Sequence, residues 1–160
     1  MQREINVPTT NASILNIFDD VGLFQGSLAP GSVTDDTTLA LSGSYSAALL
    51  AGESLRIFDG TTLLGTATLN TTARTWSFTT AALKEGSHSL TARVADAAGN
   101  LGPAGTAFAI TIDTKLQPGV LSLTDFVDTG DPTDFVSSDN SFNLSLTGQE
   151  AGATLTYRSE

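Results

Sequence analysis

The segment "RTWSFTTAALKEGSHSLTARVADAAGNLGPAGTAFAITID", Arg74–Asp113, contains three runs in which apolar and polar residues alternate. The apolar residues of equal parity are Trp76 and Phe78 in the first run, Leu90, Ala92 and Val94 in the second, and Phe108, Ile110 and Ile112 in the third. Because successive side chains point to opposite faces of a strand, each run predicts a strand with one buried face. Two packed sheets require such strands, so the segment predicts an all-β sandwich.

Four further runs of the same kind precede this segment and are separated by Gly, Pro, Asp and Asn, which favour turns. Asp59-Gly60, for example, suits a tight hairpin turn that needs positive φ. The stretch around Ala47, the only one with helical character, is expected to be a loop. We therefore expect a β-sandwich of seven strands. The strands are expected at Ser13–Phe18, Thr37–Gly43, Ser54–Asp59, Thr62–Leu69, Arg74–Thr80, Ser87–Asp96 and Thr106–Asp113.

The composition is that of a folded, acidic protein. Hydrophobic residues make up 40% of the 160 residues, and the formal net charge is −10. A surface of this sign repels phosphate backbones and anionic lipids, so we expect no nucleic-acid partner and no membrane-surface binding. Neither a run of about 18 apolar residues nor a signal peptide is present, so we expect no membrane insertion and a start inside a longer polypeptide. The absence of Cys excludes disulfides and thiolate metal sites.

A second unit begins after "IDTKLQPG", Ile112–Gly119. Aligning "TDDTTLALSG", Thr34–Gly43, with "SDNSFNLSLTG", Ser138–Gly148, reveals the same order of residues with one insertion. We therefore expect an N-terminal flank at residues 1–11, a first domain at 12–115 and the truncated start of a second, similar domain at 116–160.

Few residues could carry catalysis. His88 is the only imidazole, and its position at the beginning of a strand favours packing or capping of a loop. No nucleophile elbow and no phosphate-binding glycine motif is present. Acid pairs for sugar hydrolysis need an apolar site, whereas the Asp pairs here lie in polar stretches. We predict no enzymatic activity. Trp76 could stack on a sugar, but Phe78 shares its face, which favours the core.

Aspartate accounts for all but five of the 17 acidic residues, and its short side chain suits both turns and calcium. In a sandwich, the loop after the first strand and the end of the last strand lie at the same pole. That pole would gather Asp19, Asp20, Asp35, Asp36 and Asp113. The opposite pole would hold Asp96 and Asn100. The alternative is that these side chains only satisfy local amides in turns.

The second unit contains another acidic stretch, "DFVDTGDPTDFVSSDN", with five aspartates and no basic residue. Without a cation, repulsion between close exposed carboxylates costs several tenths of a kcal/mol per pair. The spacing is not that of an EF-hand loop. We nevertheless predict calcium binding, and the candidate ligands in this stretch are Asp125, Asp128, Asp134 and Asp139.

Four motifs occur in order at normal spacing: "DDVGLFQGSLAPGSVTDDTTLALSG", "AGESLRIFDGTTLLGTATL", "TWSFTTAALKEGSHSLTARVADAAGN" and "FAITIDT". From Ala12 to Thr114 they resemble the repeated bacterial Ig-like domain of large biofilm-associated and type I-secreted surface adhesins. The tail from Leu116 resembles the opening of a neighbouring repeat. Two features depart from the family pattern: Leu39 replaces a usual Pro, and "DTKLQPG" replaces the usual linker "DTTAP".

This resemblance implies an extracellular spacer repeat at the bacterial cell surface, stiffened by calcium near domain junctions and supporting adhesion or biofilm formation. The acidic positions of the family carry over to Asp19, Asp20, Asp35, Asp36, Asp96, Asn100 and Asp113. The expected partners are neighbouring Ig-like repeats of the same chain, with any host or matrix ligand bound through other domains. The alternative is a module whose loops bind a carbohydrate or a host protein.

Overall fold

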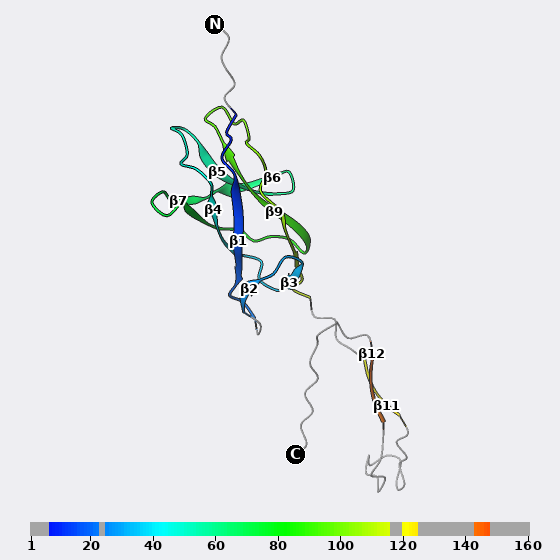
Figure 1. Cartoon of the computed structure of the whole chain (residues 1–160). Coiled ribbons are helices and arrows are strands. Elements are labelled where there is room, and N and C mark those ends of the chain that lie inside the picture. The colour runs from blue at the N-terminus through cyan, green and yellow to red at the C-terminus, as the bar shows by residue number, and fades with distance from the viewer. Residues whose placement is uncertain (1–6, 23–24, 116–119, 125–142, 148–160) are drawn as a thin grey trace, which may run out of the picture. The chain divides into compact units, whose positions relative to one another are not determined.

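The computed structural model describes residues 7–22, 25–115, 120–124 and 143–147. The chain divides into two compact units, Met1–Thr114 and Lys115–Glu160. The first unit is an all-β sandwich of two five-stranded sheets (Figure 1). Within the described residues there is no helix of the length and apolar character needed to cross a membrane.

Each sheet joins strands that are distant in sequence. The first sheet has the order β2-β1-β4-β8-β7, with all neighbours antiparallel. Its strands are β1 (Ala12–Asp19), β2 (Gly26–Leu28), β4 (Ala40–Tyr45), β7 (Thr68–Asn70) and β8 (Thr75–Thr79). The second sheet has the order β3-β10-β9-β5-β6, in which only β3 and β10 pair in parallel. Its strands are β3 (Ser32–Thr34), β5 (Ser54–Asp59), β6 (Thr62–Thr66), β9 (Gly86–Ala95) and β10 (Phe108–Ile112).

All seven expected strands are present, but the first unit contains more strands than the seven predicted. The run Thr62–Leu69 forms two strands, because the chain crosses from one sheet to the other at Ala67, whose N–H donates to the Leu55 carbonyl at 2.8 Å. The crossing requires no turn residue, so the sequence shows one continuous run. The strands β2 and β3 lie in the segment expected to be a loop. With three residues each, they are too short to give a visible alternation.

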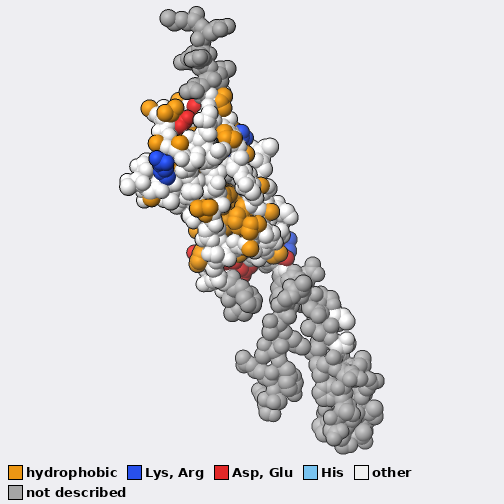
Figure 2. All heavy atoms as spheres, viewed as in Figure 1, with side chains coloured by type: hydrophobic (Ala, Val, Ile, Leu, Met, Phe, Trp, Pro, Cys, Tyr) orange, Lys and Arg blue, Asp and Glu red, His pale blue; other side chains and the backbone are white. Residues whose placement is uncertain are grey.

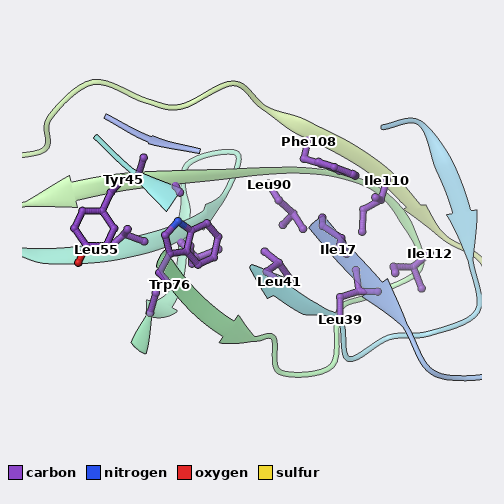
Figure 3. Close-up of a cluster of buried hydrophobic side chains, with 14 residues drawn as sticks. Ile17, Leu39, Leu41, Tyr45, Leu55, Trp76, Leu90, Phe108, Ile110 and Ile112 are labelled. Atoms are coloured by element: carbon purple, nitrogen blue, oxygen red, sulfur yellow. The ribbon is translucent and has the colours of Figure 1, made fainter. Parts of the chain in front are cut away.

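The core lies between the two sheets, where the apolar residues of equal parity meet (Figure 3). Ile17 from the first sheet and Leu90 from the second are both fully buried. Burying one such aliphatic side chain stabilises the fold by roughly 1.5–3 kcal/mol. Trp76 is 2% exposed, and its Nε1–H donates to the Ser44 carbonyl at 3.3 Å. The prediction that Trp76 belongs to the core is confirmed, and its ring is not a platform for a sugar.

Gly43 in β4 permits the close approach of β1 and the indole ring. A Cβ at this position would lie 1.9 Å from the Ser13 carbonyl oxygen and 2.6 Å from Cε2 of Trp76. On β1, the register shifts between Ile14 and Asn16, so Leu15 forms a bulge and its side chain is 67% exposed. Position 43 therefore requires glycine, because any side chain there would collide with the backbone of β1 and with the indole of Trp76.

The chain enters and leaves the sandwich at opposite ends. At the entry pole, the Asn11 amide donates to Ser46 Oγ at 3.1 Å, and Pro8 lies against Gly102. At the exit pole, β1 ends beside β3, and the Asp113 amide donates to the Thr34 carbonyl at 2.9 Å. Between the poles runs β1, whose 8 residues extend roughly 3.3 Å each. Figure 1 shows the first unit with β5 near the entry pole and β3 near the exit pole.

The described part of the second unit is one antiparallel pair, β11 (Val120–Thr124) with β12 (Asn143–Thr147). In the sequence alignment of the two units, β12 corresponds to β4. Like β12 with β11, β4 pairs antiparallel with the first strand of its own unit. The antiparallel pairing of β11 with β12 is therefore what we expect at the start of a second, similar sandwich.

Candidate functional site at the exit pole

Thr34, the last residue of β3, connects three strands at the exit pole. Its Oγ1–H donates to Asp19 Oδ2 at 2.5 Å, and the same oxygen accepts the Asp36 amide at 3.1 Å. Its carbonyl receives the amide of Asp113 beyond the end of β10. Thr34 is 4% exposed, so β1, β3 and β10 meet around a buried hydroxyl group.

Two of the predicted ligands, Asp19 and Asp36, are buried and hydrogen-bonded. Asp19 Oδ1 accepts the Val21 amide at 2.9 Å. Asp36 Oδ1 accepts the amide and the hydroxyl of Thr38 at 2.7 and 3.2 Å, and Oδ2 accepts the Asp20 amide at 3.4 Å. Burial of a carboxylate is tolerated when its oxygens receive such hydrogen bonds. Both side chains therefore hold the loops of the pole together.

The other members of the two Asp pairs point outward. Asp20 and Asp35 are exposed, and Asp113 is half-buried. The Asp35 carboxylate lies against Gly22, where a Cβ would be 2.3 Å from Oδ2. In each pair, therefore, one carboxylate is buried and the other is exposed. Figure 2 shows acidic side chains at this lower end of the sandwich.

The exit pole thus brings together all five aspartates that the sequence assigns to it. In the part of the chain that the structure describes, however, no group of three or more His, Asp or Glu side chains is arranged so that it could hold a metal ion. The two buried carboxylates accept hydrogen bonds from the loops of the pole. No complete calcium cage is therefore preformed by the described residues, and calcium binding stays a prediction.

At the entry pole, Asp96 and Asn100 bond to each other. Asp96 Oδ1 accepts the amides of Ala98 and Asn100 at 2.9 and 2.8 Å, and Oδ2 accepts Asn100 Nδ2 at 2.8 Å. The Asn100 side chain holds the pKa of Asp96 below its ordinary value, with the loop amides assisting and burial opposing. Both oxygens of Asp96 are therefore used within its own loop, as in a turn stabilised by local amides.

The candidate calcium ligands of the second unit cannot be compared with a structure. Asp125, Asp128, Asp134 and Asp139, together with Asp131, lie outside the described residues.

An ion pair that the sequence did not predict joins β5 to β9. His88 Nδ1 lies 2.7 Å from Asp59 Oδ2, and Nε2 lies 2.7 Å from the Lys84 carbonyl oxygen. Asp59 Oδ1 also accepts the Ser89 amide at 2.9 Å. Burial alone would lower the pKa of His88, but the Asp59 and Lys84 hydrogen bonds outweigh it and raise that pKa. Burial likewise opposes, without cancelling, the lowering of the pKa of Asp59 by His88 and the Ser89 amide.

A second contact missed by the sequence lies where the chain leaves the first unit. Glu85 Oε1 accepts the Thr114 amide at 3.1 Å and also the Thr114 hydroxyl. The two residues are far apart in sequence and carry no pattern that pairs them. The bonds of Asp36 to Thr38 are different, because Asp-x-Thr in a turn is a local signal that sequence reading could have used.

The match to a protein family lies within the first unit. The chain matches the model of the bacterial Ig-like domain over residues 25–114, which is more than half of its length. No curated protein matches the sequence. Among solved structures, that of CopC from Methylosinus trichosporium OB3b is similar, with 18% identity over 64% of this chain and 93% of that chain and a TM-score of 0.33. From the family match and the two-sheet sandwich, we conclude that this chain belongs to the family of bacterial Ig-like domains.

Proposed function

We propose that the chain is a structural spacer module of a large bacterial surface adhesin, located outside the cell, where it supports adhesion or biofilm formation and has no catalytic role. The observation that carries this proposal is the path of the chain, which enters the sandwich at one pole and leaves at the other. A module connected in this way adds its full length to a tandem array, and it buries its own core without help from its neighbours. The proposed partners are the adjacent Ig-like repeats.

The strand directions suit a module that bears tension. Both β1 and β10 run from the entry pole to the exit pole, and their antiparallel neighbours β4 and β9 run the opposite way. Hydrogen bonds of antiparallel pairs lie perpendicular to the strands. A pull on the two ends therefore loads the bonds of each pair simultaneously, as shear, rather than opening them one after another.

Force measurements can test the spacer function. The chain has no Cys, so handles can be placed by substitution at Val7 and Lys115, on opposite poles. A control chain carries the handles at Thr61, in the β5–β6 turn beside the middle of β9, and Lys115, so that the pull no longer acts along β1. We expect several-fold higher unfolding forces for the first pair of handles. Equal forces would contradict a design for bearing tension.

We further propose that calcium binds at the exit pole and stiffens the connection to the next repeat. Three features support this: the exposed carboxylates of Asp20 and Asp35, the half-buried Asp113 at the same pole, and the net charge of −10. Calcium accepts irregular sets of about six to eight oxygens, including water. The remaining ligands would be water or residues outside the described part of the chain. The bound ion would neutralise the repulsion among these carboxylates.

Removal of calcium is the corresponding test. We expect the melting temperature to rise with calcium relative to EDTA, because a ligand at 100 times its dissociation constant stabilises the folded state by about 2.7 kcal/mol. The double substitution Asp20→Asn and Asp35→Asn should abolish the rise, whereas Asp96→Asn at the entry pole should retain it. Magnesium at equal ionic strength controls for screening. A melting temperature that is the same in calcium and in EDTA would contradict calcium binding at this pole. The spacer function would not be affected, because the force measurement tests it separately.

The alternative function, a module that binds a ligand through its loops, lacks comparable support. Trp76, the ring considered as a sugar platform, is buried against Gly43 and donates its N–H to the Ser44 carbonyl.

A further inference from the structure

The chain leaves the first unit tied on both sides. On one side, the Asp113 amide donates to the Thr34 carbonyl and continues the β3–β10 ladder. On the other, the β9–β10 ladder ends at the pair Gly86–Ile112, and the next amide toward β9, that of Thr114, donates to the Glu85 side chain. One of the two ties is therefore made by a carboxylate in place of a main-chain carbonyl, so a side-chain substitution can remove it.

The position of Glu85 depends on the loop of residues 80–85. The Leu83 amide in this loop donates to the Thr37 carbonyl at 2.9 Å. Glu85 lies between two fixed residues. On one side, the Lys84 carbonyl oxygen lies 2.7 Å from His88 Nε2, and on the other, Gly86 pairs with Ile112 at the end of the β9–β10 ladder. His88 therefore holds the loop side of Glu85, and Asp59 in turn fixes the imidazole ring.

Both neighbours of the imidazole ring only accept hydrogen bonds. Nδ1 faces the Asp59 carboxylate and Nε2 faces a carbonyl, so both contacts are made only when both ring nitrogens carry a proton. On loss of one proton, the charged carboxylate keeps the remaining N–H, because it is the stronger acceptor. The bond to the Lys84 carbonyl is then the one that is lost.

Burial lowers the pKa of His88, but the charge of Asp59 acts on this ring and raises that pKa. The charged residues on the neighbouring elements are few. β5 contributes Asp59 and Arg56, and the loop contributes Lys84 and Glu85. β10, the other neighbour of β9, carries no charged residue between Phe108 and Ile112. The raised pKa of His88 agrees with this geometry, so the two-sided contact is complete below the ordinary pKa of about 6.5 and is lost as the pH rises through the higher folded value.

We propose that His88, Lys84 and Glu85 form a proton-sensitive clamp on Thr114 that fixes how the chain leaves the domain. With the imidazole doubly protonated, the loop is held and Glu85 fastens the exit segment. With the imidazole neutral, the Lys84 carbonyl is released, Glu85 moves, and Thr114 becomes free to reorient. The biological meaning of the clamp rests on the proposed spacer function, since it would make the direction of the linker depend on pH.

The test measures order parameters of the backbone amides in the complete chain by NMR relaxation. EDTA is present so that calcium does not contribute. In the natural sequence, the order parameter of the Thr114 amide should be that of rigid backbone at pH 5.5, about 0.85, and should fall toward the flexible range, below about 0.6, at pH 8.5. Glu85→Ala should give the low value at both pH values. His88→Gln, which has no titrating group, should give a value independent of pH.

Two controls keep the measurement specific. The Asp113 amide, tied to the main chain of Thr34, should stay ordered in all variants and thereby shows that the fold is intact. Asp96→Ala at the entry pole should behave as the natural sequence. A Thr114 order parameter unchanged by Glu85→Ala, or one that does not respond to pH in the natural sequence, would overturn the proposal. Neither result would affect the force or calcium measurements, which test the spacer function separately.

Discussion

Replacing Trp76 with alanine is expected to destabilise the first unit by about 3–5 kcal/mol, the usual cost of removing a buried aromatic side chain. The indole is 2% exposed and belongs to the same core cluster as Tyr45 and Leu55 (Figure 3). Its removal opens a cavity next to Gly43, which has no side chain to fill it, and also deletes the bond to the Ser44 carbonyl. Such a loss is a large part of the total stability of a domain.

Urea unfolding followed by far-UV circular dichroism would measure this loss, because the substitution removes the only tryptophan and with it the intrinsic fluorescence signal. Trp76→Phe should cost less, since it retains an aromatic ring. Leu15→Ala is the matched control on the same sheet: this leucine is 67% exposed, so its loss should change stability by no more than about 0.5 kcal/mol. Similar losses for Trp76→Ala and Leu15→Ala would contradict the assignment of the indole to the core.

The sandwich could be predicted because its strands are half-buried, and half-burial imposes a period of two on the sequence. Leu90, Ala92 and Val94 are all fully buried, as their parity indicates. The pattern is silent where a strand is very short, as in β2 and β3, and where the chain changes sheets without a turn, as at Ala67. These features are decided by pairing with distant strands, which a local pattern does not record.

The sequence predicted that five aspartates gather at the exit pole, but not which of their carboxylates are buried and which are exposed. The direction of the strands carries Asp19 and Asp113 to the same end, and this follows from strand order alone. Which carboxylates are buried depends on parity: Asp19 shares the buried face of β1 with Ile17. Sequence reasoning gave all five acids the same candidate role as calcium ligands, with hydrogen bonds to local turn amides as the alternative, and did not distinguish buried from exposed carboxylates. The partner that makes burial tolerable, Thr34, is 15 residues away and carries no local signal.

The same limit applies to His88. Its position at the start of a strand indicated a packing or capping role, which agrees with its bond to the Lys84 carbonyl in the adjoining loop. The ion pair with Asp59 could not be predicted, because the two residues lie 29 positions apart and meet only through the pairing of β5 with β9.

The division of the pole into buried and exposed carboxylates leads to the second large expected effect. Asp36→Ala, measured in EDTA, should destabilise the first unit by about 2–4 kcal/mol, because each hydrogen bond to a charged group contributes roughly 1.5–3 kcal/mol and this carboxylate accepts three of them. Asp36 is 1% exposed and accepts bonds from Thr38 and Asp20. The matched control is its exposed neighbour: Asp35→Ala should change stability by no more than about 0.5 kcal/mol.

Repeating both measurements in calcium separates the two roles assigned to this pole. If the exposed carboxylates bind the ion, Asp35→Ala should weaken the calcium-dependent gain in stability while leaving the stability in EDTA nearly unchanged. Asp36→Ala should lower the stability in both conditions, since its oxygens satisfy loop amides whether or not an ion is present. Equal losses for the two substitutions in EDTA would contradict this division, because they would mean that burial and hydrogen bonding do not distinguish Asp36 from Asp35. The opposite pattern, a loss for Asp35 alone, would assign the structural role to the exposed carboxylate.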